Sequence, residues 1–214
     1  MSPDSEAGSG AKITVMGYDS SAVVREEVSS MAEALDRIGL KNVTWIIVRG
    51  RLGNEGLDSL KERLNIHPVA LEEIVERYGS RPKLVDYEEH IFITWRLLRL
   101  ADREVVERQA ISLLGEGYLI SLVPEDHTFS RTVDALGNEH NQVRGLGADY
   151  LLYDIIDTAI DDYFGVSENL GDLIEDAQDR VLIDTGTRSL AEIQQLRREL
   201  IKLRKAIWPL REAI

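Results

Sequence analysis

The sequence predicts an α/β fold, with a sheet domain in the first two-thirds of the chain and a long antiparallel helical hairpin after it. Two observations carry this prediction. Segments rich in β-branched residues alternate with segments of helical apolar spacing as far as residue 146. Beyond that point the apolar spacing stays helical over many turns. We therefore expect residues 1–12 to be disordered, residues 13–146 to form the α/β domain and residues 147–214 to form the long-helix region.

Strands are expected where short runs of β-branched and aromatic residues end at turn residues. The clearest are Ile13–Tyr18, Val43–Val48, His90–Leu100, Arg108–Leu114 and Tyr118–Val123. The region from Leu84 to Glu125 carries three or four strands, with a tight turn at Gly115-Glu116-Gly117 between the last two. Ala22–Val28 fits either a strand or the start of the helix that follows it.

Helices are expected between these strands. Ser29–Ile38 has helical spacing and is followed by Gly39, a typical helix stop. The next helix is marked by Leu57, Leu60 and Leu64. A third is expected over Pro68–Tyr78, because proline in the first turn of a helix loses no hydrogen bond. Asn65 is the expected capping residue of that helix, and Gly79 is its expected end.

The hairpin begins with one long helix, expected from Gly147 to Asp184. A turn at Thr185-Gly186-Thr187 leads to a second helix that begins near Ser189, and the two are expected to pack antiparallel. Steps of three and four, typical of a coiled-coil seam, separate Leu190, Ile193, Leu196, Leu200, Leu203, Ile207 and Leu210. Pro209, after Trp208, is expected to bend the second helix, either as a packing kink or as a hinge.

The chain is acidic, with a formal net charge of −13. This argues against nucleic acid as a partner, because a phosphate-binding surface needs clustered Lys and Arg, and it fits binding of cations. The acids gather on the first long helix, where Arg180 is the only base between Gly147 and Gly186, while bases predominate after Gly186. Two interpretations are open: the charges pair across the hairpin, or the surplus of acids binds cations.

Composition also excludes several classes of protein. The absence of cysteine excludes disulfides, thiolate metal sites and cysteine nucleophiles. No run reaches the roughly 18 consecutive apolar residues of a membrane helix, so we expect this chain to be soluble. The first ten residues are small and polar, unlike a signal peptide. The seam pattern is still running at Ile214, which indicates a truncated chain.

Three motifs follow one another along the chain. The first is HPVALEEI at 67–74 with RPK at 81–83, the second is ADYLLYDIID at 148–157 with DDYF at 161–164, and the third is LRKAIWPLRE at 203–212. Together they resemble, in matching order, the HPL-x-LED-I…RPK, ADYLLY-x-x-ID…DDYF and LRK-x-IWPLRE motifs of CorA magnesium transporters. The similarity covers nearly the whole chain after residue 13.

The resemblance implies a fold and an assembly. Members of the family have a cytoplasmic α/β/α sandwich with a mixed sheet, then long helices, then two transmembrane helices with a Gly-Met-Asn signature between them. They assemble as homopentameric channels. The signature is absent here, so the resemblance implies the cytoplasmic regulatory part of a subunit, lying on the cytoplasmic side of the cell membrane and reaching it only through helices beyond this chain.

The resemblance also implies divalent-cation sites between subunits. On one side lies the acidic pair Glu72 and Glu73, and on the other an Asp that matches Asp157. The second acid of the pair is usually Asp in the family, so direct contact of Glu73 with metal is an open question. Asp154, Asp157 and Asp161 form one acidic stripe on the helix, which adds Asp154 and Asp161 as candidate ligands. Oxygen ligands favour Mg²⁺, and Co²⁺ or Ni²⁺ also fit.

The implied mechanism is a shift of equilibrium in which metal bound between subunits favours the closed channel. Two other functions stay open: a zinc-transporting member of the same superfamily, and a non-transporting acidic module that binds metal or protein. An enzyme is not expected. His67 with Glu72 and Glu73 lacks the H-E-x-x-H spacing of a metallohydrolase, and the other histidines form no evident cluster. His67 is expected instead to stand at the entry of a helix.

Overall fold

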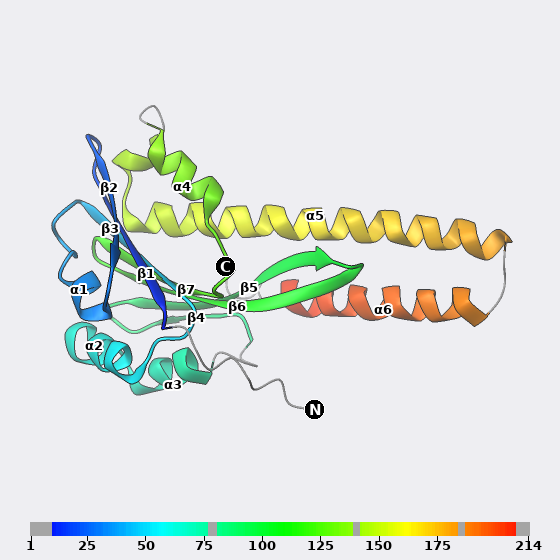
Figure 1. Cartoon of the computed structure of the whole chain (residues 1–214), viewed down its shortest axis with the longest axis horizontal. Coiled ribbons are helices and arrows are strands. Elements are labelled where there is room, and N and C mark those ends of the chain that lie inside the picture. Colours follow the sequence, from blue (N-terminus) through cyan, green and yellow to red (C-terminus); the bar gives the residue numbers. More distant parts are fainter. Residues whose placement is uncertain (1–9, 77–80, 139–141, 184–186, 209–214) are drawn as a thin grey trace.

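The computed structural model describes residues 10–76, 81–138, 142–183 and 187–208 of the 214-residue chain. A seven-stranded mixed sheet carries helices on both faces, and two long antiparallel helices extend away from it (Figure 1). This confirms the predicted α/β/α sandwich with a helical hairpin after it. No helix in the described part of the chain has the length and apolar character needed to cross a bilayer.

The strands follow the order β2-β1-β3-β7-β6-β5-β4 across the sheet. Their bounds are β1 Lys12–Tyr18, β2 Val23–Val28, β3 Val43–Arg49, β4 Lys83–Asp86, β5 Ile91–Ala101, β6 Glu104–Gly115 and β7 Tyr118–Val123. The central pair β3 and β7 is parallel, and the other neighbours are antiparallel. The clearly expected strands are therefore confirmed, and the ambiguous segment Ala22–Val28 proves to be an edge strand.

Helices cover the two faces of the sheet unequally. The bounds are α1 Met31–Leu35, α2 Asn54–Leu64, α3 Pro68–Glu76, α4 Ser130–Gly137, α5 Ala148–Ile183 and α6 Thr187–Ile207, with a 3₁₀ turn at Gln142–Gly145. Residues of α1, α2 and α3 pack on one face, and residues of α4 and α5 pack on the other (Figure 1). The sequence patterns missed α4, a short helix of eight residues.

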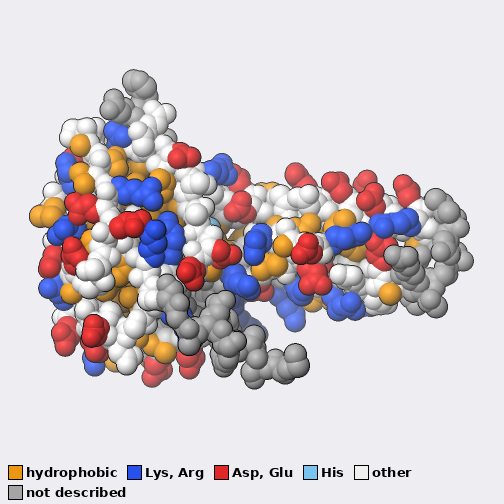
Figure 2. Space-filling model, in the orientation of Figure 1, with side chains coloured by type: hydrophobic (Ala, Val, Ile, Leu, Met, Phe, Trp, Pro, Cys, Tyr) orange, Lys and Arg blue, Asp and Glu red, His pale blue; other side chains and the backbone are white. Residues whose placement is uncertain are grey.

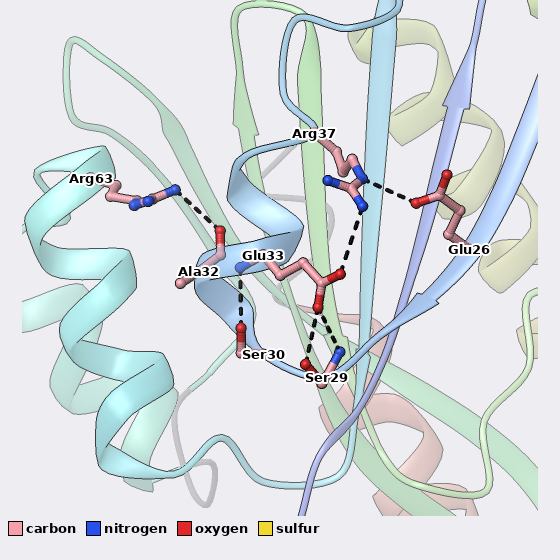
Figure 3. A network of polar contacts seen from close by, with 7 residues as sticks. All are labelled: Glu26, Ser29, Ser30, Ala32, Glu33, Arg37 and Arg63. Atoms are coloured by element: carbon pink, nitrogen blue, oxygen red, sulfur yellow. Dashed lines mark hydrogen bonds and ion pairs between the residues drawn. The ribbon is translucent and has the colours of Figure 1, made fainter.

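Capping side chains decide where two of the short helices begin. Ser30 accepts a hydrogen bond from the Glu33 amide, while the Glu33 carboxylate accepts from Ser29 and pairs with Arg37 (Figure 3). Asn65 is not the cap of α3, because it ends α2 in a left-handed conformation with φ of 48°. His67 caps α3 instead: its Nδ1 accepts from the Val69 amide at 3.2 Å. The expected end of α3 at Gly79 lies outside the described residues.

Two cores lie on opposite faces of the sheet. Along β3, Trp45 packs on the side of α4 and α5, while its neighbour Ile46 packs on the side of α1, α2 and α3, and both are fully buried. Such runs of consecutive buried residues are typical of a sheet covered on both faces. The buried Trp45 indole N–H donates to the Ser121 hydroxyl at 3.0 Å, so the core leaves this polar group paired.

The β5–β6 hairpin supports the long helices. Its two-residue tip, Asp102-Arg103, has positive φ at both positions, as a tight hairpin turn requires. The Tyr163 hydroxyl of α5 donates to the Arg96 carbonyl of β5. The buried Glu199 carboxylate of α6 accepts from the Val105 amide of β6 at 2.8 Å. The sheet and the rod formed by α5 and α6 are therefore joined by hydrogen bonds as well as by apolar packing.

Only part of the predicted coiled-coil seam is buried. Leu196 and Leu203 of α6 are buried, together with Glu199 and Ala206, where the helix meets α5 and the hairpin. The remaining described seam residues are exposed: Ile193, Leu200 and Ile207. The seam prediction is wrong for these three: the buried edge of α6 follows Leu196, Glu199, Leu203 and Ala206, where β6 shares the contact with α5. The side chains of Leu190 and Leu210, the turn residues Asp184–Gly186 and Pro209 lie outside the described structure.

Candidate cation-binding site

The two acids of the first motif point in different directions from α3. Glu72 is exposed, whereas Glu73 is half-buried and pairs with Lys83 of β4. The second carboxylate oxygen of Glu73, Oε2, is buried without a hydrogen-bond partner in the described structure. Adjacent residues on a helix diverge by about 100°, which explains the difference. The ion pair joins the two halves of this motif, because Glu73 comes from one half and Lys83 from the other.

The three acids of the α5 stripe differ in their surroundings. Asp154 is half-buried and accepts a hydrogen bond from the Thr132 hydroxyl at 2.7 Å. Asp161 is exposed and pairs with Arg131 at 2.9 Å. Asp157 is exposed, and no hydrogen bond or ion pair joins it to another described residue. Within one chain, Asp157 is therefore the member of the stripe whose carboxylate faces solvent without competition.

Two residues of α4 bind the outer acids of the stripe: Arg131 pairs with Asp161, and Thr132 donates to Asp154. The sequence analysis predicted neither Arg131 nor Thr132. Arg131 and Thr132 follow each other at the start of α4, next to α5. The Asp161 carboxylate raises the pKa of Arg131, so this guanidinium stays charged. Burial raises the pKa of the neighbouring Asp162, although Arg131 opposes that shift. The available signal was the helical spacing of Phe129, Val133 and Leu136, which alone is too short to predict a helix.

The candidate ligands do not meet inside one chain. Glu72 and Glu73 belong to α3 on one face of the sheet, and Asp157 belongs to α5 on the other (Figure 1). No group of three or more His, Asp and Glu side chains in the described ranges is arranged to hold a metal ion.

Charge is segregated along the rod, and among the described residues most acids of α5 have no partner on α6. Acidic side chains follow the outer edge of α5 (Figure 2). Among the described residues, the ion pair that joins α5 to α6 has the opposite polarity to the one expected. Its base is Arg180 of α5 and its acid is Glu192 of α6, 3.0 Å apart. Glu192 also accepts from Arg103 at the tip of the β5–β6 hairpin. The cross-hairpin pairing considered above therefore does not account for the acids of α5 that the structure describes.

Comparison with known proteins gives consistent matches. The family model described as CorA-like Mg²⁺ transporter protein matches residues 41–214. The cobalt/magnesium transport protein CorA of Thermotoga maritima is 28% identical over 207 residues, which cover 95% of this chain and 58% of that protein. This chain thus spans less than two-thirds of the length of that relative.

Solved structures show the same fold. The soluble domain of CorA from Methanocaldococcus jannaschii aligns with a TM-score of 0.66 and 18% identity, covering 94% of this chain and 76% of that one. The cytoplasmic domain of ZntB from Vibrio parahaemolyticus aligns with a TM-score of 0.64 and 17% identity, covering 96% and 78%. These likenesses show the fold, and the family match, which spans most of the sequence, shows that the chain belongs to the CorA-like Mg²⁺ transporter family.

Proposed function

We propose that this chain is the cytoplasmic regulatory domain of a homopentameric divalent-cation channel and that it senses Mg²⁺ at acidic sites between subunits. Co²⁺ and Ni²⁺ are the other cations that we propose for the same oxygen ligands. Family membership and the name of the Thermotoga relative, a cobalt/magnesium transport protein, support the proposal. The proposed role is one of binding and regulation, without catalysis, at the cytoplasmic side of the cell membrane.

The observation that carries the proposal is the position of Glu72 and Asp157. Both carboxylates are exposed, and they lie on opposite faces of the sheet. A ring of identical subunits is built from head-to-tail contacts, in which each subunit offers two different surfaces. Glu72 of one subunit and Asp157 of the next can then approach one cation. Mg²⁺ suits such a site, because it retains several waters and binds through one or two carboxylates.

The other three candidates take a different part in this proposal. Lys83 holds Glu73, Thr132 holds Asp154 and Arg131 holds Asp161. A carboxylate that already accepts from an ion-pair or hydrogen-bond partner has fewer lone pairs to offer a metal and is held in a fixed direction. We therefore propose Glu72 and Asp157 as direct ligands, with the other three acids contributing to the negative field around the site.

The proposed mechanism is a cation-dependent equilibrium between two arrangements of the subunits. Bound Mg²⁺ reduces repulsion between the facing carboxylates and favours the closed, symmetric ring. Loss of Mg²⁺ restores the repulsion and favours opening. The cation shifts this equilibrium only by its difference in affinity for the two arrangements, so the site must be more complete in the closed ring.

A zinc-transporting member of the same superfamily is the second candidate. The cytoplasmic domain of ZntB has a similar fold, which is compatible with that alternative, and at 17% identity the likeness shows the fold alone. A panel of Mg²⁺, Co²⁺, Ni²⁺ and Zn²⁺ at equal ionic strength separates the two. Stabilisation by Zn²⁺ alone would favour zinc, and stabilisation by Mg²⁺ would favour the proposal. The third possibility raised by the sequence, a non-transporting module, would be supported by a full-length gene without two apolar segments of about 20 residues downstream.

The test is the substitution Asp157→Asn, which removes one charge and leaves the shape of the side chain nearly unchanged. Mg²⁺ is expected to protect the assembled wild-type protein from heat and proteolysis, and the variant is expected to lose that protection. Glu72→Gln should behave in the same way. Glu168→Gln, which neutralises another exposed acid of α5, is the matched control and should keep the protection. Unchanged protection in Asp157→Asn would remove this residue from the site.

A further inference from the structure

A separate cleft opens where four segments meet at one end of the sheet. The β4–β5 turn, the β6–β7 turn, the start of β3 and the start of α5 line a volume of about 890 Å³. This size is within the range of small-molecule sites. The lining of this turn cleft includes neither Glu72 nor Asp157, so it is distinct from the site proposed above.

Five carboxylates line the turn cleft: Asp86, Glu88, Glu89, Glu116 and Asp149. No Lys or Arg is among the lining residues, and none of the five forms an ion pair with another described residue. Three of them come from the β4–β5 turn, where the Glu88 amide donates to Asp86 at 3.0 Å. So many carboxylates around one hollow produce a strongly negative potential, which favours a cationic ligand.

A buried imidazole in the wall of the cleft is a second observation that points to a ligand. His90 lines the cleft and is only 3% exposed, yet neither ring nitrogen has a hydrogen-bond partner in the described structure. Burial lowers the pKa of His90, although Glu89 and Asp86 oppose the shift. A neutral imidazole has one nitrogen that accepts a hydrogen bond, and buried polar groups are rarely left unpaired. An N–H donor from a ligand would supply the missing partner.

The rest of the lining is apolar. Val43, Ile91, Leu114 and Ala148 contribute to the same cleft as the carboxylates. A hydrated metal ion gains nothing from apolar walls, because its water shell would lose hydrogen bonds there. An organic cation has methylene groups that bury favourably against such walls while its charged nitrogens reach the acids.

Small residues shape the cleft. The Tyr118 ring lies over Gly115, and the Asp149 carboxylate folds back over Gly147, so a Cβ at either glycine would collide with its neighbour. Burial raises the pKa of Tyr118, and the negative charge of Glu89 adds to the shift.

We propose that the turn cleft binds a small organic cation that carries two or more ammonium groups joined by methylene chains. The ammonium groups bind the carboxylates of the two turns and of α5, and one N–H donates to His90. The methylene chain lies against the apolar lining. Through the stacked rings of Tyr87 and His67, 5.0 Å apart, the occupied turn also contacts the cap of α3, the helix that carries Glu72.

The probe is spermidine, titrated into ¹⁵N-labelled protein at constant ionic strength. We expect saturable one-to-one binding, with shifts of the amide resonances of Gly115, Gly117 and Gly147, which lie around the cleft. Glu88→Gln combined with Glu89→Gln changes only exposed side chains, and it should weaken binding about tenfold, as expected from the loss of two charged contacts.

The matched control is Asp172→Asn combined with Asp176→Asn, which removes the same charge from exposed positions of α5. This control should bind spermidine as the wild type does, and so should Asp157→Asn, which separates this proposal from the sensing function. Equal weakening in both double variants would indicate general charge attraction and overturn the proposal. Mg²⁺ producing the same saturable shifts at equal ionic strength would also overturn it, because the cleft would then be a metal site.

Discussion

The α/β unit and the α5–α6 rod bury their apolar residues in different ways. In the sheet, both faces are covered, so neighbouring residues such as Trp45 and Ile46 are both fully buried. In α6, one edge is buried, while Ile193 and Leu200 remain 42% exposed. The sheet is thus stabilised by many mutually supporting contacts. The attachment of α6 depends on fewer contacts, and one of them is the buried carboxylate of Glu199.

This difference fits the proposed roles of the two regions. A rigid sheet keeps α3 and the start of α5 at fixed positions, which a site shared between subunits requires. A rod that is held at a few points can change its angle at a smaller free-energy cost. The two regions should therefore respond very differently to equivalent substitutions.

The largest expected effect is that of Leu119→Ala in β7. Leu119 is fully buried in the same core as Trp45, so its removal should lower the free energy of unfolding by about 3–4 kcal/mol. Leu200→Ala makes the same chemical change on the exposed edge of α6 and should cost less than about 0.5 kcal/mol. Urea unfolding followed by circular dichroism measures both. Similar losses in the two variants would contradict the comparison.

A smaller loss is expected from Glu199→Ala, which tests how α6 is attached. The change leaves the buried Val105 amide without an acceptor and removes the ion pair with Lys202, at a cost of about 2 kcal/mol. Hydrogen exchange should become faster at the Val105 amide and along α6, with little change in β3.

Arg103→Ala is the control for this second prediction. It removes an ion pair with Glu192 at the same junction, where the Arg103 side chain is 44% exposed, and should cost less than about 0.5 kcal/mol. If Glu199→Ala accelerated exchange in β3 as much as in α6, the two regions would be unfolding together.

Local patterns were sufficient for most elements of the fold. The strand Tyr118–Val123 and the helix starting after Gly147 are set by β-branched runs and by long helical spacing, which are properties of the segment itself. Asn65 was assigned to the wrong helix, because either neighbouring helix could have used it. The sequence predicted only some of the buried residues of α6. A repeat shows that the helix has an apolar stripe, but it does not show which neighbouring elements cover that stripe.

The candidate site shows the same limit. The motifs pointed to Glu72 and Asp157, and the structure places both at the surface. That Lys83 holds Glu73 and that Thr132 holds Asp154 could not be predicted, because each contact joins segments brought together only by the fold. The turn cleft likewise combines four segments, none of which has a motif of its own.

The smallest expected effect concerns pH and the sheet region. Burial lowers the pKa of His127 from 6.5 to about 4, with the nearby charge of Arg49 adding to the shift and Asp126 opposing it. Between these two values the unfolded chain binds more protons than the folded one, so stability falls as the pH falls. The contribution is fully present above pH 6.5 and decreases toward pH 4. From pH 7 to pH 5 we expect a loss of about 1 kcal/mol from this residue, after allowance for its partial exposure.

His127→Gln should remove that part of the pH dependence, and urea unfolding at pH 7, 6 and 5 measures it. His90, whose pKa is also lowered by burial, remains in the variant, so some loss toward acid should persist. The difference in unfolding free energy between wild type and variant should therefore change by about 1 kcal/mol over this range. A constant difference would mean that His127 is protonated equally in the folded and unfolded states.

Acid should weaken the sheet before the rod, because no histidine occurs after residue 140, and hydrogen exchange at pH 5 can test that order.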